Sequence, residues 1–110
     1  MAVPRDALRI EQNSLKQFER PGHGGTRNVA HFCPDCGNRI FHENPEQPDI
    51  LRLKTGTLDS QDVVQPLMHI WASRRPAWLQ LPEGGLVFET QETPAEMLAA
   101  LQAHLAERRA

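Results

Sequence analysis

The sequence predicts a mainly β domain that ends in a single α-helix. Nine prolines and seven glycines fall mostly between short apolar runs, and this spacing favours many short strands. A Cys-x-x-Cys turn at residues 33–36 is followed by residues typical of a strand rather than of a helix start. Apolar residues take up helical spacing only after Thr93. We therefore expect a β domain over residues 1–92 and an amphipathic helix over residues 93–110.

Two short strands or one hairpin are expected near the N-terminus. Residues 7–11 alternate apolar and polar side chains, and residues 12–14 break this pattern. Residues 15–19 resume a strand-like pattern with two apolar residues, Leu15 and Phe18. The glycine-rich residues 21–25 then predict a turn.

Three further strands are expected in the second half of the β domain. Leu51 and Leu53 alternate with charged residues, which is the pattern of a half-buried strand. The run around Trp71 is strongly apolar, and a polar turn with Asp59 and Asp62 precedes it. The expected strands are residues 49–54, 67–72 and 86–89.

The sequence around Thr93 predicts the start of a helix. Thr93 is a suitable N-cap, Pro94 suits the first helical position, and Glu96 lies three residues after the cap. We expect the helix to run from about Pro94 to Arg108, where basic residues meet the negative end of the helix dipole. One apolar face should pack on the β domain or on another chain, and it comprises Met97, Leu98, Leu101 and Leu105.

Length, charge and hydropathy narrow the class of protein. A chain of 110 residues suits one domain with a modest core. The formal net charge is −2 and no Lys/Arg run is interleaved with aromatic residues, so we expect no nucleic-acid partner. No apolar run is long enough to span a bilayer and no apolar leader follows Met1. We therefore expect no membrane partner and a cytoplasmic location.

Cys33 and Cys36 are the only cysteines in the chain and the strongest candidates for a chemical site. Residues 26–32 and 39–42 have the composition of strands, so the cysteine turn is expected on a hairpin. Gly37 can adopt a positive φ without a Cβ clash, and such a turn directs backbone N–H groups at a thiolate.

Three interpretations of this pair are open: a zinc site, a thiol–disulfide redox pair, or cysteines that bind nothing. In a cytoplasmic protein, two close cysteines favour metal or redox chemistry over a structural disulfide. A redox pair usually gains its low thiol pKa at a helix N-terminus, which the strand-like run after Gly37 does not offer. We therefore favour Zn2+ bound by Cys33 and Cys36. A closed zinc site takes about four ligands, so further ligands are needed.

Histidines are the candidates for the remaining ligands. His31 and His42 bracket the cysteine turn, and His23 lies in the preceding loop. Each either binds metal or packs in the core or at the surface, because the direction of a strand side chain depends on register. His69, inside an apolar run, is expected to be a hydrogen-bonded structural residue, with a role in a pocket as the alternative.

The other chemically interesting residues have simpler explanations. Asp59 and Asp62 are expected to be turn residues, with general acid–base work as the alternative. Trp71 and Trp78 are expected to pack in the core. The sequence shows no Ser/His/Asp arrangement and no phosphate-binding loop, so we assign no catalytic residue.

Five short motifs follow one another in a recognisable order, and they are Phe32-Cys-Pro-Asp-Cys-Gly37, Gly56-Thr-Leu-Asp59, His69-Ile-Trp71, Pro76-Ala-Trp78 and Leu81-Pro82. Together they resemble the C-terminal half of the glutathione-dependent formaldehyde-activating enzyme family, also called the CENP-V/GFA domain. The resemblance covers roughly residues 7–88, and the ordered set is far more specific than any one motif. It implies an Mss4-like fold of small coiled antiparallel sheets around zinc.

The resemblance also implies metal ligands and a reaction. Members of the family usually carry a structural zinc site, which joins an early Cys-x-Cys pair to a later Cys-x-x-Cys pair, and a catalytic zinc site in a Cys-x-Cys-x-x-Cys cluster. Cys33 and Cys36 match the later structural pair, whereas residues 1–32 contain no cysteine to match the others. The implied reaction makes or breaks a carbon–sulfur bond in the adduct of glutathione and formaldehyde, with zinc as the Lewis acid.

Two descriptions of the protein follow. The first is a zinc-binding protein that resembles carbon–sulfur lyases, with the glutathione adduct as its small-molecule partner. The second, which we favour for the chain by itself, is a non-catalytic metal-binding scaffold fragment that self-associates. Its zinc site is completed either in a homodimer, by Cys33 and Cys36 of both chains, or by an N-terminal segment missing from a shortened chain. A thiol redox protein is a further alternative.

Overall fold

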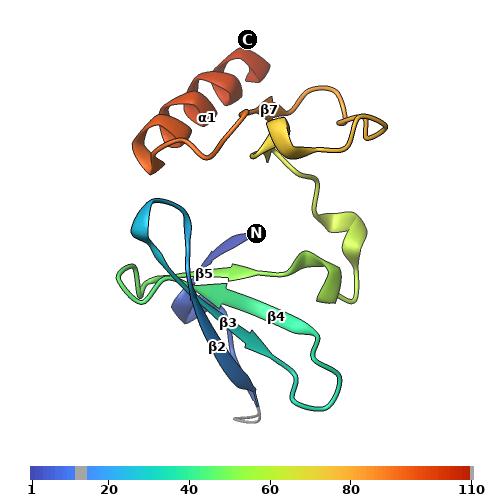
Figure 1. Ribbon diagram of the computed structural model, residues 1–110. Coiled ribbons are helices and arrows are strands. Elements are labelled where there is room, and N and C mark those ends of the chain that lie inside the picture. The colour runs from blue at the N-terminus through green and yellow to red at the C-terminus, as the bar shows by residue number, and fades with distance from the viewer. Residues whose placement is uncertain (12–14, 110) are drawn as a thin grey trace. The chain divides into compact units, whose positions relative to one another are not determined.

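The computed structural model describes residues 1–11 and 15–109, in two compact units that follow one another along the chain (Figure 1). Met1–Val64 contains a five-stranded sheet, and Gln65–Ala110 contains a strand pair and a helix. The mainly antiparallel β fold with one C-terminal helix is confirmed. The elements are β1 (Ala2–Pro4), β2 (Lys16–Pro21), β3 (Arg27–Phe32), β4 (Arg39–Glu43), β5 (Ile50–Leu53), β6 (Met68–His69), β7 (Leu86–Val87) and α1 (Pro94–Arg109).

The sheet of the first unit has the strand order β1-β5-β4-β3-β2, and every neighbouring pair is antiparallel. β3 and β4 form the hairpin that carries the cysteine turn, as predicted. The register of this hairpin shifts after His31, which faces Phe41. Phe32 then faces Arg39 rather than Ile40, which leaves one extra residue on β4. An extra residue of this kind bends a strand, here directly beside the cysteines.

The first strand lies earlier in the chain than predicted. Residues 7–11 do not form a strand, because Arg5–Ala7 is a 3-10 turn and the residues after it are irregular. β1 pairs with the edge of β5 instead. The N–H of Arg5 donates to the carbonyl of Asp49 at 2.8 Å, where the chain leaves the sheet. The alternation of apolar and polar residues does not show which segment will pair with another strand.

The other strands predicted for this unit are present. Residues 15–19 correspond to β2, residues 26–32 to β3 and residues 49–54 to β5. The break predicted at residues 12–14 lies outside the described residues.

The core of the first unit is formed by the three central strands. Val29, His31, Phe41 and Leu51 are buried on one face of the sheet, and Phe41 and Leu51 are only 2% and 1% exposed. Ala30 is also buried but points to the opposite face, because successive strand residues alternate. The edge strand β2 is exposed along its whole length. The cysteine turn therefore continues directly from the most buried part of the unit.

The second unit has shorter strands than predicted. Of residues 67–72, only β6 is a strand, and it pairs in parallel with β7. Trp71 has φ 57°, and this left-handed conformation at a bulky residue ends the extended run. Ala72–Arg74 then forms a 3-10 turn. The strand predicted at residues 86–89 is likewise reduced to β7.

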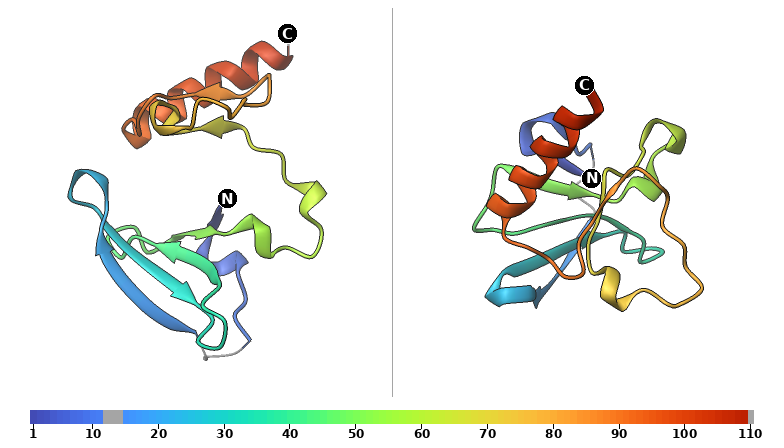
Figure 2. Two further views of the ribbon diagram at one scale, coloured as in Figure 1. Left: turned by 45° about the vertical axis from the view of Figure 1, so that its right-hand side comes forward. Right: turned by 90° about the horizontal axis from the view of Figure 1, so that it is seen from above.

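α1 begins at the predicted capping box and lies along the strand pair (Figure 2). The N–H of Thr93 donates to Glu96 Oε2 at 2.9 Å, and the N–H of Glu96 donates to Thr93 Oγ1 at 3.3 Å. The bond from the Thr93 N–H is also the main reason that the pKa of Glu96 is lowered. Among the described residues, no helix is long and apolar enough to cross a bilayer.

The packed face of α1 is rotated from the predicted one. Leu98 is 56% exposed, so its assignment to that face is wrong. Each helical residue turns by about 100° around the axis, and the step from Met97 to Leu98 leaves the packed stripe. The half-buried residues recur at helical spacing, and they are Met97, Ala100, Leu101, His104 and Leu105.

Thr93→Ala is expected to lower the stability of α1 by about 1 kcal/mol, because the N–H of Glu96 loses its side-chain acceptor. Urea unfolding followed by helical circular dichroism measures this change. Gln102→Ala, at an exposed position of the same helix, is the matched control and should not reduce stability. Equal losses in both variants would contradict a stabilising role for the capping box.

Candidate metal centre

The β3–β4 hairpin holds Cys33 and Cys36 in a tight turn. The N–H of Cys33 donates to the carbonyl of Asn38 at 2.9 Å, and the N–H of Gly37 donates to the carbonyl of Cys33 at 2.8 Å. Gly37 has φ 76°, a conformation that a side chain would strain. These bonds close the turn at the point where the two strands separate, so the sheet fixes the backbone of both cysteines.

The two thiols of the turn lie together. Cys33 is half-buried, Cys36 is exposed, and neither forms a disulfide. Cys33 Sγ accepts hydrogen bonds from the backbone N–H groups of Cys36 and Asp35 and interacts with the Cys36 side chain. These bonds, led by that from the Cys36 N–H, lower the pKa of the Cys33 thiol. The turn thus favours a thiolate, which is the form that binds metal.

His31 is part of the core rather than of the cysteine turn. Its ring stacks on Phe41 with the ring centroids 4.1 Å apart, and its Nε2 lies 3.1 Å from Glu43 Oε1. Arg5 pairs with the other carboxylate oxygen of Glu43, which ties the N-terminal 3-10 turn to the sheet. Burial, followed by the charge of Arg5, lowers the pKa of His31. Its ring nitrogen is therefore engaged by a carboxylate and not by the thiols.

His42 lies on the face of the sheet opposite to the core. It is half-buried and faces Arg52 across β4 and β5. Burial is the largest cause that lowers its pKa to about 4, and the charges of Lys54 and Arg52 follow. The amino group of Met1 and the guanidinium of Arg20 add to the same effect. The imidazole of His42 is therefore neutral at neutral pH and surrounded by cations.

His42 is expected to make the protein less stable as pH falls from 6.5 towards about 4. Its pKa is lower in the folded state, so the unfolded chain binds more protons over this range and acid favours unfolding. In His42→Gln, the melting temperature should fall less steeply between these pH values. His23→Gln, at an exposed loop position, is the control and should follow the parent. Identical pH profiles for the parent and His42→Gln would refute this assignment.

Among the residues that the structure describes, none is placed as a third metal ligand beside the two cysteines. Within the described ranges, 1–11 and 15–109, no group of three or more His, Cys, Asp or Glu side chains is placed to hold a metal ion. Two adjacent thiolates correspond to half of a four-sulfur zinc site. Cys33 and Cys36 therefore fit zinc as a half-site.

His69 lies in the second unit, half-buried on β6. Gly85 packs against its ring so closely that an added Cβ would lie 3.2 Å from His69 Nε2. His69 also lines a cavity of about 130 Å³, together with Glu83 and Arg108. The residue thus combines a packing role with a position in a pocket.

The two tryptophans differ in their surroundings. Trp71 is half-buried, and the guanidinium carbon of Arg74 lies 5.6 Å from its ring centroid. Trp78 is 80% exposed, so the expectation that it packs in the core is wrong. It lies in a turn closed by a 3.0 Å bond from the N–H of Leu79 to the carbonyl of Pro76, and this turn directs the indole outward.

Asp59 and Asp62 are both exposed. Asp59 lies in a bend and Asp62 in a 3-10 turn, which agrees with their interpretation as turn residues. Within residues 1–11 and 15–109, neither belongs to a group of three or more His, Cys, Asp or Glu side chains that could hold a metal ion. Their surroundings therefore do not favour general acid–base chemistry.

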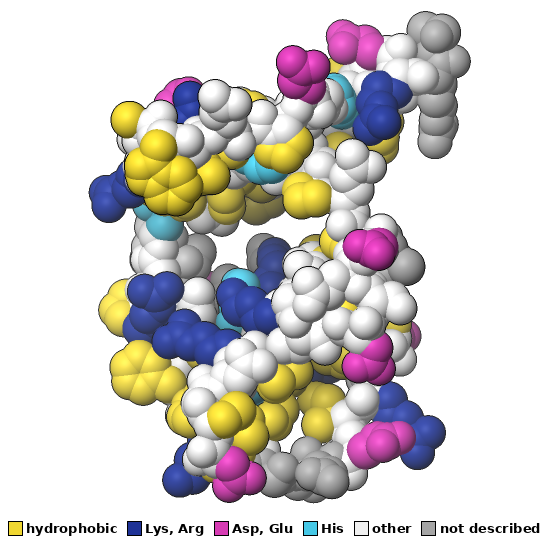
Figure 3. All heavy atoms as spheres, turned by 90° about the vertical axis from the view of Figure 1, so that its right-hand side faces the viewer, with side chains coloured by type: hydrophobic (Ala, Val, Ile, Leu, Met, Phe, Trp, Pro, Cys, Tyr) yellow, Lys and Arg dark blue, Asp and Glu magenta, His cyan; other side chains and the backbone are white. Residues whose placement is uncertain are grey.

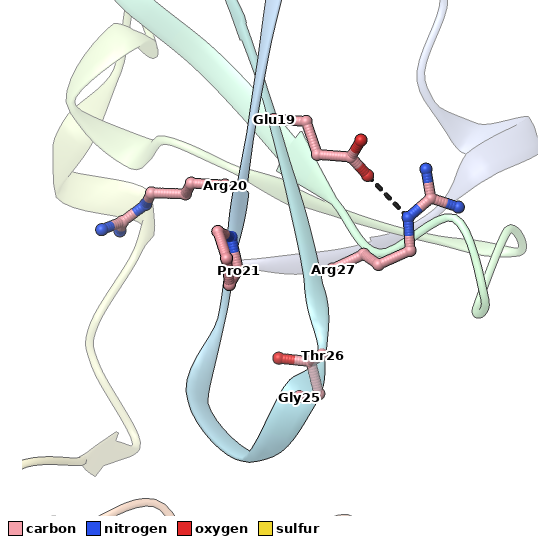
Figure 4. A pocket seen from close by; sticks show the side chains of 6 residues that line it. All are labelled: Glu19, Arg20, Pro21, Gly25, Thr26 and Arg27. Atoms are coloured by element: carbon pink, nitrogen blue, oxygen red, sulfur yellow. Dashed lines mark hydrogen bonds and ion pairs between the residues drawn. The ribbon is translucent and has the colours of Figure 1, made fainter.

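A surface hollow of about 380 Å³ lies at the turn between β2 and β3 (Figure 4). Glu19 and Arg27 form an ion pair of 2.6 Å on one side of the hairpin, and Arg20 points to the other side. The hydroxyl of Thr26 donates to the carbonyl of His23 at 2.9 Å. The hollow is lined by Glu19, Arg20, Pro21, Gly25, Thr26 and Arg27. No thiol lines it, so it is not part of the candidate metal centre.

The part of the chain that includes this hairpin matches the model of a known protein family. The family model described as glutathione-dependent formaldehyde-activating enzyme matches residues 1–74, which is more than half of the chain. The match includes the cysteine turn and the His69-Ile-Trp71 motif, and it ends before Pro76. No curated protein and no solved structure matches the chain.

Proposed function

Because the chain belongs to the glutathione-dependent formaldehyde-activating enzyme family, we propose that it is a zinc-binding protein with Cys33 and Cys36 as ligands. The main support for the proposal is that two backbone N–H groups donate to Cys33 Sγ, which lies beside the Cys36 thiol. Such donors stabilise thiolates, and thiolates are the sulfur ligands of structural zinc. Metal binding is also general in this family, which supports the same assignment.

A second copy of the chain is our proposed source of the remaining ligands. Each chain contributes two thiolates, and two chains together supply the four sulfurs of a structural zinc site. Cys36 is exposed, so its thiol is accessible to a partner. Bound zinc would join the two hairpins, and its binding free energy would add to that of folding and association.

The test measures zinc content together with molecular mass in solution. We expect one zinc per two chains and a dimer that separates when a chelator removes the metal. One zinc in each monomer would refute the shared site but not zinc binding. A monomer that takes up no zinc under reducing conditions would refute zinc binding itself.

A carbon–sulfur lyase activity on the adduct of glutathione and formaldehyde is a second proposal, and family membership is what supports it. Zinc would supply Lewis-acid polarisation to such a reaction. Since the described residues gather no third metal ligand, we expect the purified chain to remain a non-catalytic scaffold. NMR of a mixture of glutathione and formaldehyde, with and without the chain, measures the exchange rate of the adduct. Acceleration that depends on Cys33 would overturn the scaffold description.

Thiol redox chemistry is the remaining alternative. The lowered pKa of Cys33 and the adjacent free thiol of Cys36 favour it. Two thiols and one molecule of glutathione disulfide would give a protein disulfide and two molecules of glutathione. Rapid formation of this disulfide in protein incubated with excess zinc would favour redox chemistry over zinc binding.

A further inference from the structure

Several positively charged side chains lie on one face of the five-stranded sheet. His42 on β4 faces Arg52 on β5, and Lys54 follows two residues later on the same side. On β3, Ala30 faces both His42 and Phe18, and Arg20 lies two residues after Phe18 on β2. We call Arg20, His42, Arg52 and Lys54 the basic face.

The acidic residues of the sheet lie on the opposite face. Glu19 pairs with Arg27, and Glu43 pairs with Arg5 and His31. Figure 4 shows Arg20 directed away from the paired Glu19 and Arg27. Alternation along each strand thus separates the carboxylates from the basic face.

The cations of the basic face have no acidic partner within the described part of the chain. The ion pairs found there do not include Arg20, Arg52 or Lys54. In Figure 3, dark blue Lys and Arg side chains gather beside a cyan histidine, and the magenta acidic side chains lie apart from them. The positive charges are therefore concentrated although the whole chain has a formal net charge of −2.

The surroundings of His42 show the effect of these grouped positive charges. The side chain is half-buried, and charges near partly buried groups are screened less by salt than fully exposed charges. Burial is the largest cause that disfavours protonation of His42, and the charges of Lys54, Arg52, the Met1 amino group and Arg20 add to it. A bound anion would offset the same charges and would make His42 easier to protonate.

We propose that the basic face binds the phosphate group of a small molecule. Arginine guanidinium groups bind phosphate oxygens in a bidentate manner, and lysine adds a compact positive charge. A neutral imidazole adds one N–H donor. A phosphate monoester concentrates nearly two negative charges in one group, which suits cations grouped around one histidine. This site is separate from the cysteine turn, and the proposal does not depend on zinc.

The test follows the imidazole signals of the full chain by NMR while inorganic phosphate replaces chloride at constant ionic strength. We expect phosphate to raise the pKa of His42 by about one unit, and to leave the pKa of His31, on the opposite face of the sheet, unchanged. Equal responses to phosphate and chloride would overturn the proposal, because they would reflect general screening only. A stronger response to citrate than to phosphate would also overturn it.

Matched arginine variants locate the site. Arg52→Gln should weaken phosphate binding by about tenfold, because one charged donor is lost. Arg27→Gln removes an arginine from the opposite face of the same sheet, where Glu19 already pairs with it, and should bind phosphate like the parent. Equal weakening of phosphate binding in both variants would refute the proposed site. The proposal would also be refuted if self-association of the chain abolished the change in the pKa of His42.

Discussion

Cys33→Ser is expected to remove bound zinc and to make the melting temperature independent of chelators. In the parent, zinc binding should stabilise the hairpin, because metal affinity is part of the free energy of folding. Complete structural zinc sites contribute about 10–16 kcal/mol in small zinc peptides. Loss of the thiolate that receives two backbone N–H donors should therefore have the largest effect of any single substitution at this site.

The measurement compares zinc content and melting temperature with and without EDTA. Asp35→Ala is the matched control, since it keeps the backbone N–H that donates to Cys33 Sγ and should retain zinc. Cys36→Ser should reproduce the loss of zinc at a more exposed position, which separates metal binding from misfolding. Equal chelator sensitivity in the parent and in Cys33→Ser would contradict zinc binding at this turn.

Local signals explain why the hairpin and the helix start were predictable. The bonds that close the cysteine turn join residues within the segment from Cys33 to Asn38. The capping box of α1 likewise joins Thr93 to Glu96. Because each motif satisfies its own backbone groups, the residue types and their spacing were sufficient to predict the local structure.

Elements that depend on distant partners were predicted less well. β1 is a strand because it meets β5, whose sequence is about fifty residues later. The apolar run of β6 ends at Trp71, whose N–H donates to the carbonyl of Thr90. Neither partner is encoded in the local alternation of apolar and polar residues. The ends of these strands are therefore set by pairing with distant segments and not by the local pattern of apolar and polar residues.

The interaction of His31 with Glu43 was missed for a related reason. Alternation places Phe41 and Glu43 on one side of β4, but it does not fix which residues of β3 face them. The extra residue at Ile40 shifts this register, so a count outward from the cysteine turn gives the wrong pairing. Further ligands of the proposed zinc site are subject to the same limit, since side chains that complete a metal site need not be near in sequence.

Phe41→Ala is expected to destabilise the first unit by about 3–5 kcal/mol. Phe41 is 2% exposed on a central strand and stacks on His31, so truncation leaves a cavity and removes a neighbour of a buried histidine. Since domains are typically stable by about 5–15 kcal/mol, this loss should unfold a measurable fraction of the first unit at 37 °C. The variant should therefore weaken the support of the cysteine turn as well as the core.

Phe18→Ala is the matched control because Phe18 lies on the edge strand of the same sheet and is 56% exposed. Its removal should cost less than about 1 kcal/mol. Both tryptophans, Trp71 and Trp78, belong to the second unit, so fluorescence would not report this unfolding. Hydrogen exchange of β3 and β5 amides measures it directly, and exchange should accelerate strongly in Phe41→Ala only. Similar acceleration in both variants would mean that the two faces of the sheet are equally important for stability, which the burial of Phe41 argues against.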